Sequence, residues 1–148
     1  MGTFYFFLFQ AHSGWRWIAL LLLVITTVKV AIGLVAGQKW TSLDQKLVTF
    51  TNIAVSIQVL LGIFLYVLLL TQGGGITGRT VGSITTAHMI PALLAIGAIG
   101  FASARSKKAG TDRQKFMMAT IGMVIAVLMV VGALMAVGGI FAMATAGS

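Results

Sequence analysis

Residues 47–70 of the chain, LVTFTNIAVSIQVLLGIFLYVLLL, carry no charged side chain and are almost entirely apolar. A helix crosses the hydrocarbon core of a bilayer, about 30 Å thick, with about 20 apolar residues, because each residue adds about 1.5 Å. A helix that is apolar on every side also needs an apolar environment on every side. This stretch therefore predicts a membrane-spanning helix.

The rest of the chain has the same character. Of its 148 residues, 59% are hydrophobic and 8% are charged, whereas a soluble domain carries about 25% charged residues. Similar apolar runs occupy residues 15–36, 80–103 and 116–140, and their short connections place consecutive helices side by side and antiparallel. The aromatic segment 1–10 either extends the first span or lies in the membrane interface. The sequence thus predicts an all-α membrane protein, a single domain over residues 1–148 that forms an antiparallel bundle of four transmembrane helices.

The positive charges indicate an orientation for this multi-pass bundle. The chain has ten Lys and Arg residues and two Asp and Glu residues, which gives a net charge of +8. Eight of the cations fall on one side of the predicted membrane: Lys29, Lys39, Lys46, Arg105, Lys107, Lys108, Arg113 and Lys115. Arg16 and Arg79 fall on the other side. Because cytoplasmic loops are enriched in Lys and Arg, we expect the eight to face the cytoplasm and both chain termini to face outward.

Composition excludes several functional classes. The chain has no cysteine, so disulfides, thiolate metal sites and iron–sulfur ligation are impossible. Its only acidic residues, Asp44 and Asp112, lie in polar connections, and catalysis by paired carboxylates or carboxylate-driven antiport therefore lacks its main residue type. The cations separate apolar runs instead of forming a basic face, which argues against a nucleic-acid partner.

The two histidines of the chain are predicted to lie at the same depth. His12 stands at the outward start of the first span, and His88 lies about two turns into the third. Lys29 follows His12 by 17 residues, and Arg105 follows His88 by 17 residues. At 1.5 Å per residue both intervals are about 26 Å. Both imidazoles are therefore expected in the outer half of the membrane, on helices that are candidates for neighbours.

Two imidazoles at one depth are what a six-coordinate haem requires, one nitrogen on each side of the porphyrin. We identify His12 and His88 as candidate ligands of the iron of a haem b, which needs no cysteine. Arg16, one turn after His12, and Arg79 are candidates for pairing with the propionates. The alternative is that the histidines form hydrogen bonds across the bundle and that Arg16 anchors the helix to headgroups.

Three segments carry a family resemblance: HSGWRW at 12–17, TSLDQKLVTFTNIAVSIQVLLGIFLY at 41–66 and AHMIPALLAIGAIGFASARSKKAGTDRQKF at 87–116. They resemble a family of small four-helix bacterial membrane proteins that are labelled cytochrome b. His12 matches the opening motif of the family, and His88 matches its third-helix histidine. Ser56 occupies the place of a further histidine of the family, and Ala87 that of an acidic residue. The resemblance implies one haem b and a location in the bacterial inner membrane.

These observations lead us to expect a membrane electron-transfer protein or subunit without catalytic activity of its own. Expected partners are the lipid bilayer and either other subunits of a respiratory or photosynthetic complex or a second copy of the chain. A quinone is a further candidate. The alternative is a haem-free accessory subunit that stabilises such a complex. A small transporter is a third hypothesis, for which the best polar cluster is Asn52, Ser56 and Gln58.

Overall fold

The computed structural model describes residues 2–71 and 85–136, which are helical almost throughout. The elements are α1 (Gly2–Val35), α2 (Ser42–Thr71), the π-helical segment η1 (Thr85–Met89), α4 (Ile90–Lys108) and α5 (Asp112–Ala136). Four helices in this part of the chain are long and apolar enough to cross a membrane. The predicted class, an all-α bundle of four transmembrane helices, is confirmed.

The helices extend beyond the predicted spans where the structure describes them. α1 begins at Gly2 and not at residue 15, so the aromatic segment continues the first helix. α2 begins at Ser42, and α5 begins at Asp112. The residues added at the start of α2 and α5 are polar caps and first turns, which hydropathy alone does not include in a span. Residues 80–84 and 137–140 of the predicted spans lie outside the described residues.

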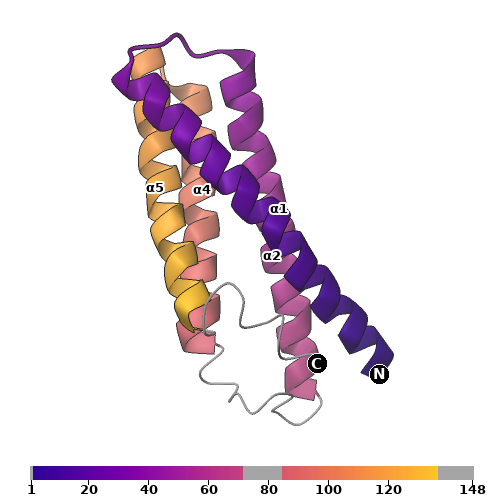
Figure 1. Ribbon diagram of the computed structural model, residues 1–148. Helices are drawn as coiled ribbons and strands as arrows, with labels where there is room; N and C mark the ends of the chain where they lie inside the picture. Colours follow the sequence, from indigo (N-terminus) through magenta and orange to yellow (C-terminus); the bar gives the residue numbers. More distant parts are fainter. Residues whose placement is uncertain (1, 72–84, 137–148) are drawn as a thin grey trace.

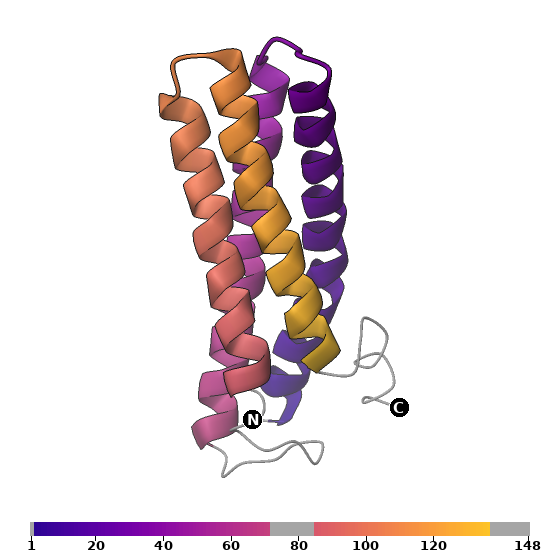
Figure 2. The same cartoon turned by 90° about the vertical axis from the view of Figure 1, so that its left-hand side faces the viewer.

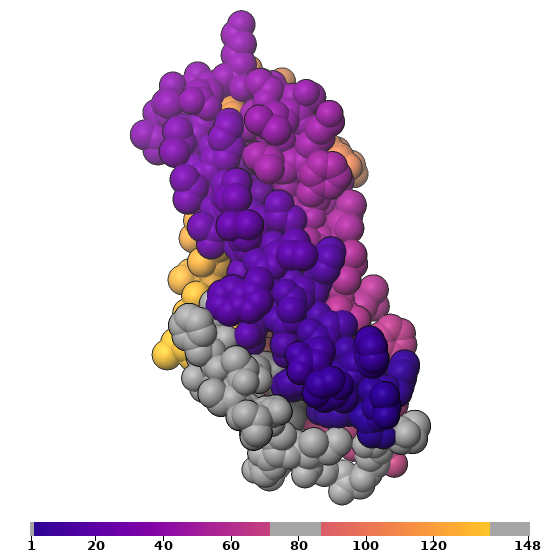
Figure 3. All heavy atoms as spheres, turned by 45° about the vertical axis from the view of Figure 1, so that its right-hand side comes forward, coloured from indigo at the N-terminus to yellow at the C-terminus, as the bar shows by residue number. Residues whose placement is uncertain are grey.

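The four helices form two antiparallel hairpins that pack against each other (Figures 1 and 2). α1 contacts α2 and α5, and α4 contacts the same two helices, which places α1 and α4 on a diagonal of the bundle. The connections 36–41 and 109–111 lie at one end of the molecule, which we call the hairpin end, and the N-terminus lies toward the other end. Figure 3 shows α1 running obliquely over the bundle with α2 beside it.

Buried residues recur along each helix at alternating intervals of three and four residues. In α1 this series consists of His12, Arg16, Ala19, Leu23, Thr26, Val30 and Gly33. A repeat of 3.5 residues keeps one seam of a helix facing its neighbours as the helices wind around each other. The outward faces carry large exposed apolar side chains such as Phe7, Leu21 and Leu128. This distribution suits a bundle surrounded by lipid.

The hairpin end is fixed by complementary caps. α1 ends in a Schellman motif, in which Gly37 has a φ of 62° and the amide of Gln38 donates to the carbonyl of Gly33 over 3.0 Å. α2 begins with a reciprocal cap between Thr41 and Asp44. Asp44 is fully buried and also accepts a hydrogen bond from Lys29 Nζ over 2.7 Å. The first hairpin is therefore joined by an ion pair between a buried carboxylate and a partly exposed ammonium group.

Polar contacts also join α1 to α2 deeper in the bundle. The hydroxyls of Thr26 and Thr51, both fully buried, lie 2.7 Å apart. Trp15 donates its indole N–H to the carbonyl of Ala54 over 2.8 Å. Such contacts hold transmembrane helices together where no hydrophobic driving force acts between them.

Some glycines of the helices lie at close contacts with a neighbouring helix, and others do not. A Cβ added at Gly122 of α5 would lie 2.5 Å from Ala102 Cβ and 2.6 Å from the carbonyl oxygen of Ala98. α4 and α5 therefore approach each other closely at this point. Gly97, Gly100 and Gly132 instead face open space, so their small size is not required by packing within the chain.

Candidate functional site

A cavity of about 180 Å³ lies inside the bundle, with lining residues from α1, α2, η1, α4 and α5. Its lining is mostly apolar. The buried faces of the helices, which pack against one another at the hairpin end, line the cavity here. The room comes from small residues that occupy seam positions, namely Ala19, Gly62, Ala92, Ala95 and Ala133. The polar side chains that the sequence analysis selected lie among them: His12, Arg16 and His88. Apolar walls with a few placed polar groups are typical of a ligand site.

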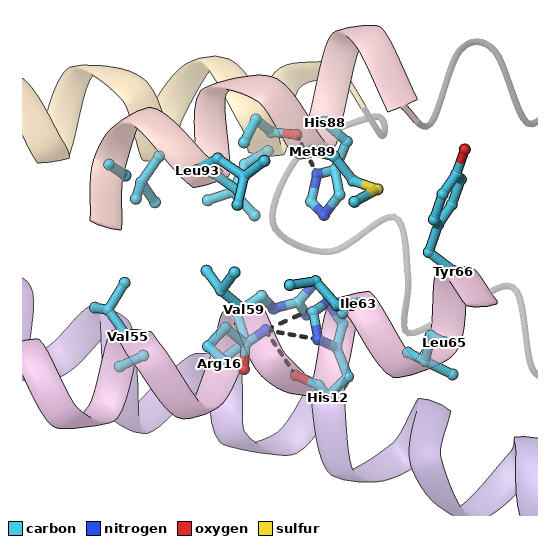
Figure 4. Close-up of a pocket in the computed structure, with 18 of the residues that line it drawn as sticks. His12, Arg16, Val55, Val59, Ile63, Leu65, Tyr66, His88, Met89 and Leu93 are labelled. Carbon is cyan, nitrogen blue, oxygen red and sulfur yellow. Dashed lines mark hydrogen bonds between the residues drawn. The ribbon is translucent and has the colours of Figure 1, made fainter. Parts of the chain in front are cut away.

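The structure brings His12 and His88 together across this cavity. Their ring centres are 6.4 Å apart and their planes make an angle of 78°, and Figure 4 shows the two rings pointing toward one another from opposite walls. The equal depth predicted from residue counting agrees with this placement. The expectation of neighbouring helices does not, because α1 and α4 are diagonal. The pair therefore spans the bundle interior.

His88 is held by a backbone carbonyl. Its Nδ1 lies 2.9 Å from the carbonyl oxygen of Ala133 in α5. A carbonyl only accepts, so Nδ1 carries the proton in this contact. In the neutral ring, Nε2 is then the nitrogen with the free lone pair. His88 belongs to η1, which ends at Met89, two residues before Pro91. The ring of Pro91 prevents a regular helical hydrogen bond to the preceding turn. The π-helical form of η1 is a feature that is frequent at functional sites.

His12 is held from α2. Gln58 Nε2 donates to the His12 carbonyl over 2.9 Å and lies 3.3 and 3.4 Å from the two ring nitrogens. Gly62, one turn further, faces the ring, and a Cβ at this position would lie 3.1 Å from His12 Cε1. Asn52, Ser56 and Gln58 form the polar cluster of the second span in the sequence. Of these three, only Gln58 lines the cavity.

Arg16 lines the cavity one turn from His12 and is 6% exposed. Its Nε and Nη1 atoms are buried and have no hydrogen-bond partner among the described residues. The guanidinium carbon lies 5.5 Å from the centre of the Trp17 ring. The other predicted propionate partner, Arg79, lies outside the described residues. Ser56, the position of a histidine in the resembling family, does not line the cavity.

The histidine pair fits an ion held between two opposed nitrogens. Metal–imidazole bonds of about 2.0–2.1 Å on opposite sides of an ion separate the ring centres by about 6 Å, close to the distance in this structure. The described residues contain no group of three or more His, Cys, Asp or Glu side chains able to hold a metal.

Comparison of the chain with models of known protein families, with curated proteins and with solved structures finds no match. Function is therefore inferred from the side chains of the cavity, together with the resemblance carried by the three sequence segments.

Proposed function

We propose that the protein is a membrane electron-transfer protein that holds one haem b between His12 and His88. The observation that carries the proposal is the 6.4 Å separation of two imidazole rings that face each other across an apolar cavity. The bond from His88 Nδ1 to Ala133 adds support. A ligating histidine usually donates its other ring nitrogen to a carbonyl or carboxylate, which fixes the tautomer and the ring orientation.

The residues around the pair suit electron transfer more than catalysis. His12 and His88 would hold the haem, and a haem held by two histidines would supply one-electron transfer and would not bind oxygen or a substrate. The carbonyl of Ala133 holds one imidazole, and Gln58 and Gly62 confine the other. The lining of the cavity is mostly apolar, and the apolar shell around a metal site influences its redox potential.

The orientation and the partners belong to the same proposal. With the eight cations of the hairpin end in the cytoplasm, the histidine pair lies in the outer half of the bacterial inner membrane, and both termini face the periplasm. The site would then exchange electrons with another subunit of a membrane complex, with a quinone, or with a second copy of the chain.

The visible spectrum of the purified protein tests the proposal. Protein that is produced in a haem-replete bacterium and purified in mild detergent should show a b-type α-band on reduction, with one haem per chain. A chain that shows no such band, either as purified or after addition of haemin, is not a cytochrome of this kind.

A substitution of Gly62 tests whether its close packing against the His12 ring is needed for haem binding. Gly62→Val is expected to lower haem retention at least tenfold, because the new side chain would push the imidazole away from His88. The matched control is Gly97→Val in α4, where an added Cβ meets nothing within 4 Å. Haem content per chain, measured after identical purification, checks the prediction, and equal loss in both variants would contradict it.

The alternative, a haem-free accessory subunit, is favoured by one observation. Both imidazoles already have partners within the bundle, Gln58 for His12 and the Ala133 carbonyl for His88. In that case the protein should co-purify with a larger membrane complex and carry no pigment of its own. Substitution of either histidine should then alter stability and no redox signal.

A further inference from the structure

Arg16 is a buried cation without an anion. It is 6% exposed, and its Nε and Nη1 atoms have no partner among the described residues. A guanidinium that is removed from water loses its hydration. Its burial is favourable only when an anion or other acceptors replace the water. The contact with the face of Trp17 at 5.5 Å supplies part of this replacement, but it leaves the buried N–H groups without acceptors.

The chain itself has no anionic side chain to offer. Its only two acidic residues are Asp44 and Asp112. Asp44 begins α2 and is bound by Lys29, which lies 13 residues beyond Arg16 along α1, or about 20 Å. Asp112 begins α5 at the same end and is exposed. Both carboxylate side chains are therefore at the hairpin end, and an external molecule with an acid group would supply the acceptors that the described residues lack.

The surroundings of Arg16 define the chemistry of that molecule. Arg16 lines the same cavity as the histidine pair, and its neighbours along the α1 face of the cavity, Ala19 and Leu23, are apolar. We propose that the cavity selects an acidic ligand, a hydrophobic body with a carboxylate that binds Arg16, and that it does so whether or not the ligand carries iron. The identity of the ligand rests on the proposed function. The new element is that the acid group of the ligand is required for binding.

Metal-free protoporphyrin IX separates this contact from iron ligation, because it has the two carboxylates but no metal for the histidines. Its dimethyl ester has the same ring and no acid. In apoprotein purified in phospholipid-free, non-ionic detergent, porphyrin fluorescence titrations should show about ten- to hundredfold tighter binding of the diacid than of the diester, as expected for a charge-assisted hydrogen bond.

Variants assign this preference to Arg16. Arg16→Gln should bind diacid and diester equally, Arg16→Lys should recover part of the preference, and Arg105→Gln, which removes a cation at the hairpin end, should retain all of it. Equal binding of diacid and diester by the unaltered protein would overturn the proposal without any variant. Survival of the preference in Arg16→Gln would overturn it as well.

Two further arms distinguish the sources of failure. If added phosphatidylglycerol abolishes the acid preference by competition, Arg16 serves a lipid phosphate and the proposal is wrong. If haemin gives no spectrum of a bis-histidine haem while the metal-free diacid keeps its advantage, the proposed function fails and the acid site stands. If the haem spectrum is normal while diacid and diester bind equally, the proposed function stands and the acid site fails.

Discussion

On the proposed function, replacement of His12 or His88 by alanine is expected to abolish the α-band of the bound haem. The chain has only these two histidines and no cysteine, so neither imidazole has a substitute of its own kind in the sequence. The ring centres lie 6.4 Å apart, which leaves the remaining imidazole as a ligand on one side only. Haem per chain should fall more than tenfold in each variant, as measured by reduced-minus-oxidised spectra at equal protein concentration.

Chemical rescue separates loss of a ligand from loss of the fold. In His88→Gly, free imidazole can occupy the vacated space, and millimolar imidazole should restore the six-coordinate spectrum. An α-band that is unchanged in both alanine variants would contradict ligation by this pair. A loss of the band that imidazole does not reverse, together with a broadened gel-filtration profile, would assign His88 a structural role.

Replacement of Asp44 by alanine is expected to lower the free energy of unfolding by about 3 kcal/mol, the lower end of the range for a broken buried ion pair. Asp44 is fully buried and holds both Lys29, at 2.7 Å, and the cap of α2 at Thr41. Its removal leaves the Lys29 ammonium, whose side chain is 34% exposed, without its counter-charge. Unfolding in detergent by a denaturing surfactant measures the effect.

The other acidic residue of the chain is the matched control. Asp112 also stands in the first turn of a helix at the hairpin end, but it is exposed. Asp112→Ala should therefore cost less than about 1 kcal/mol, the contribution of a charge at a helix terminus. Adding Lys29→Met to Asp44→Ala should recover part of the loss, because the unpaired cation is then removed. Equal effects of the two alanine substitutions would show that the ion pair contributes nothing.

The four spans could be predicted from the sequence because the length of an apolar run and the thickness of a bilayer are directly comparable. Helix ends could not, because a helix continues through any segment without a breaker. The aromatic segment that starts α1 contains no proline, and α2 starts at Ser42 because Thr41 and Asp44 cap it. Hydropathy detects neither effect.

The common depth of His12 and His88 was also predictable, because straight helices of known rise make residue counts into depths. Their approach across the bundle was not, because the expected neighbouring helices are diagonal. Other parts of the site carry no such signal. The carbonyl of Ala133 is a backbone group that every residue possesses, and the diagonal placement of α1 and α4 depends on which way the second hairpin packs. The position of Gln58, by contrast, does carry a signal. Alternating intervals of four and three residues that start at Asp44 reach Gln58, on the buried side of α2.

The diagonal placement of the two histidines has a consequence for the biogenesis of the protein. His12 belongs to the first hairpin and His88 to the second, so neither half of the chain contains both members of the proposed binding site. The hairpins can enter the bilayer one after the other, but the site exists only after they have docked. A ligand that is bound by both rings would act as a cross-link between the two halves, and its insertion would be the last step of assembly.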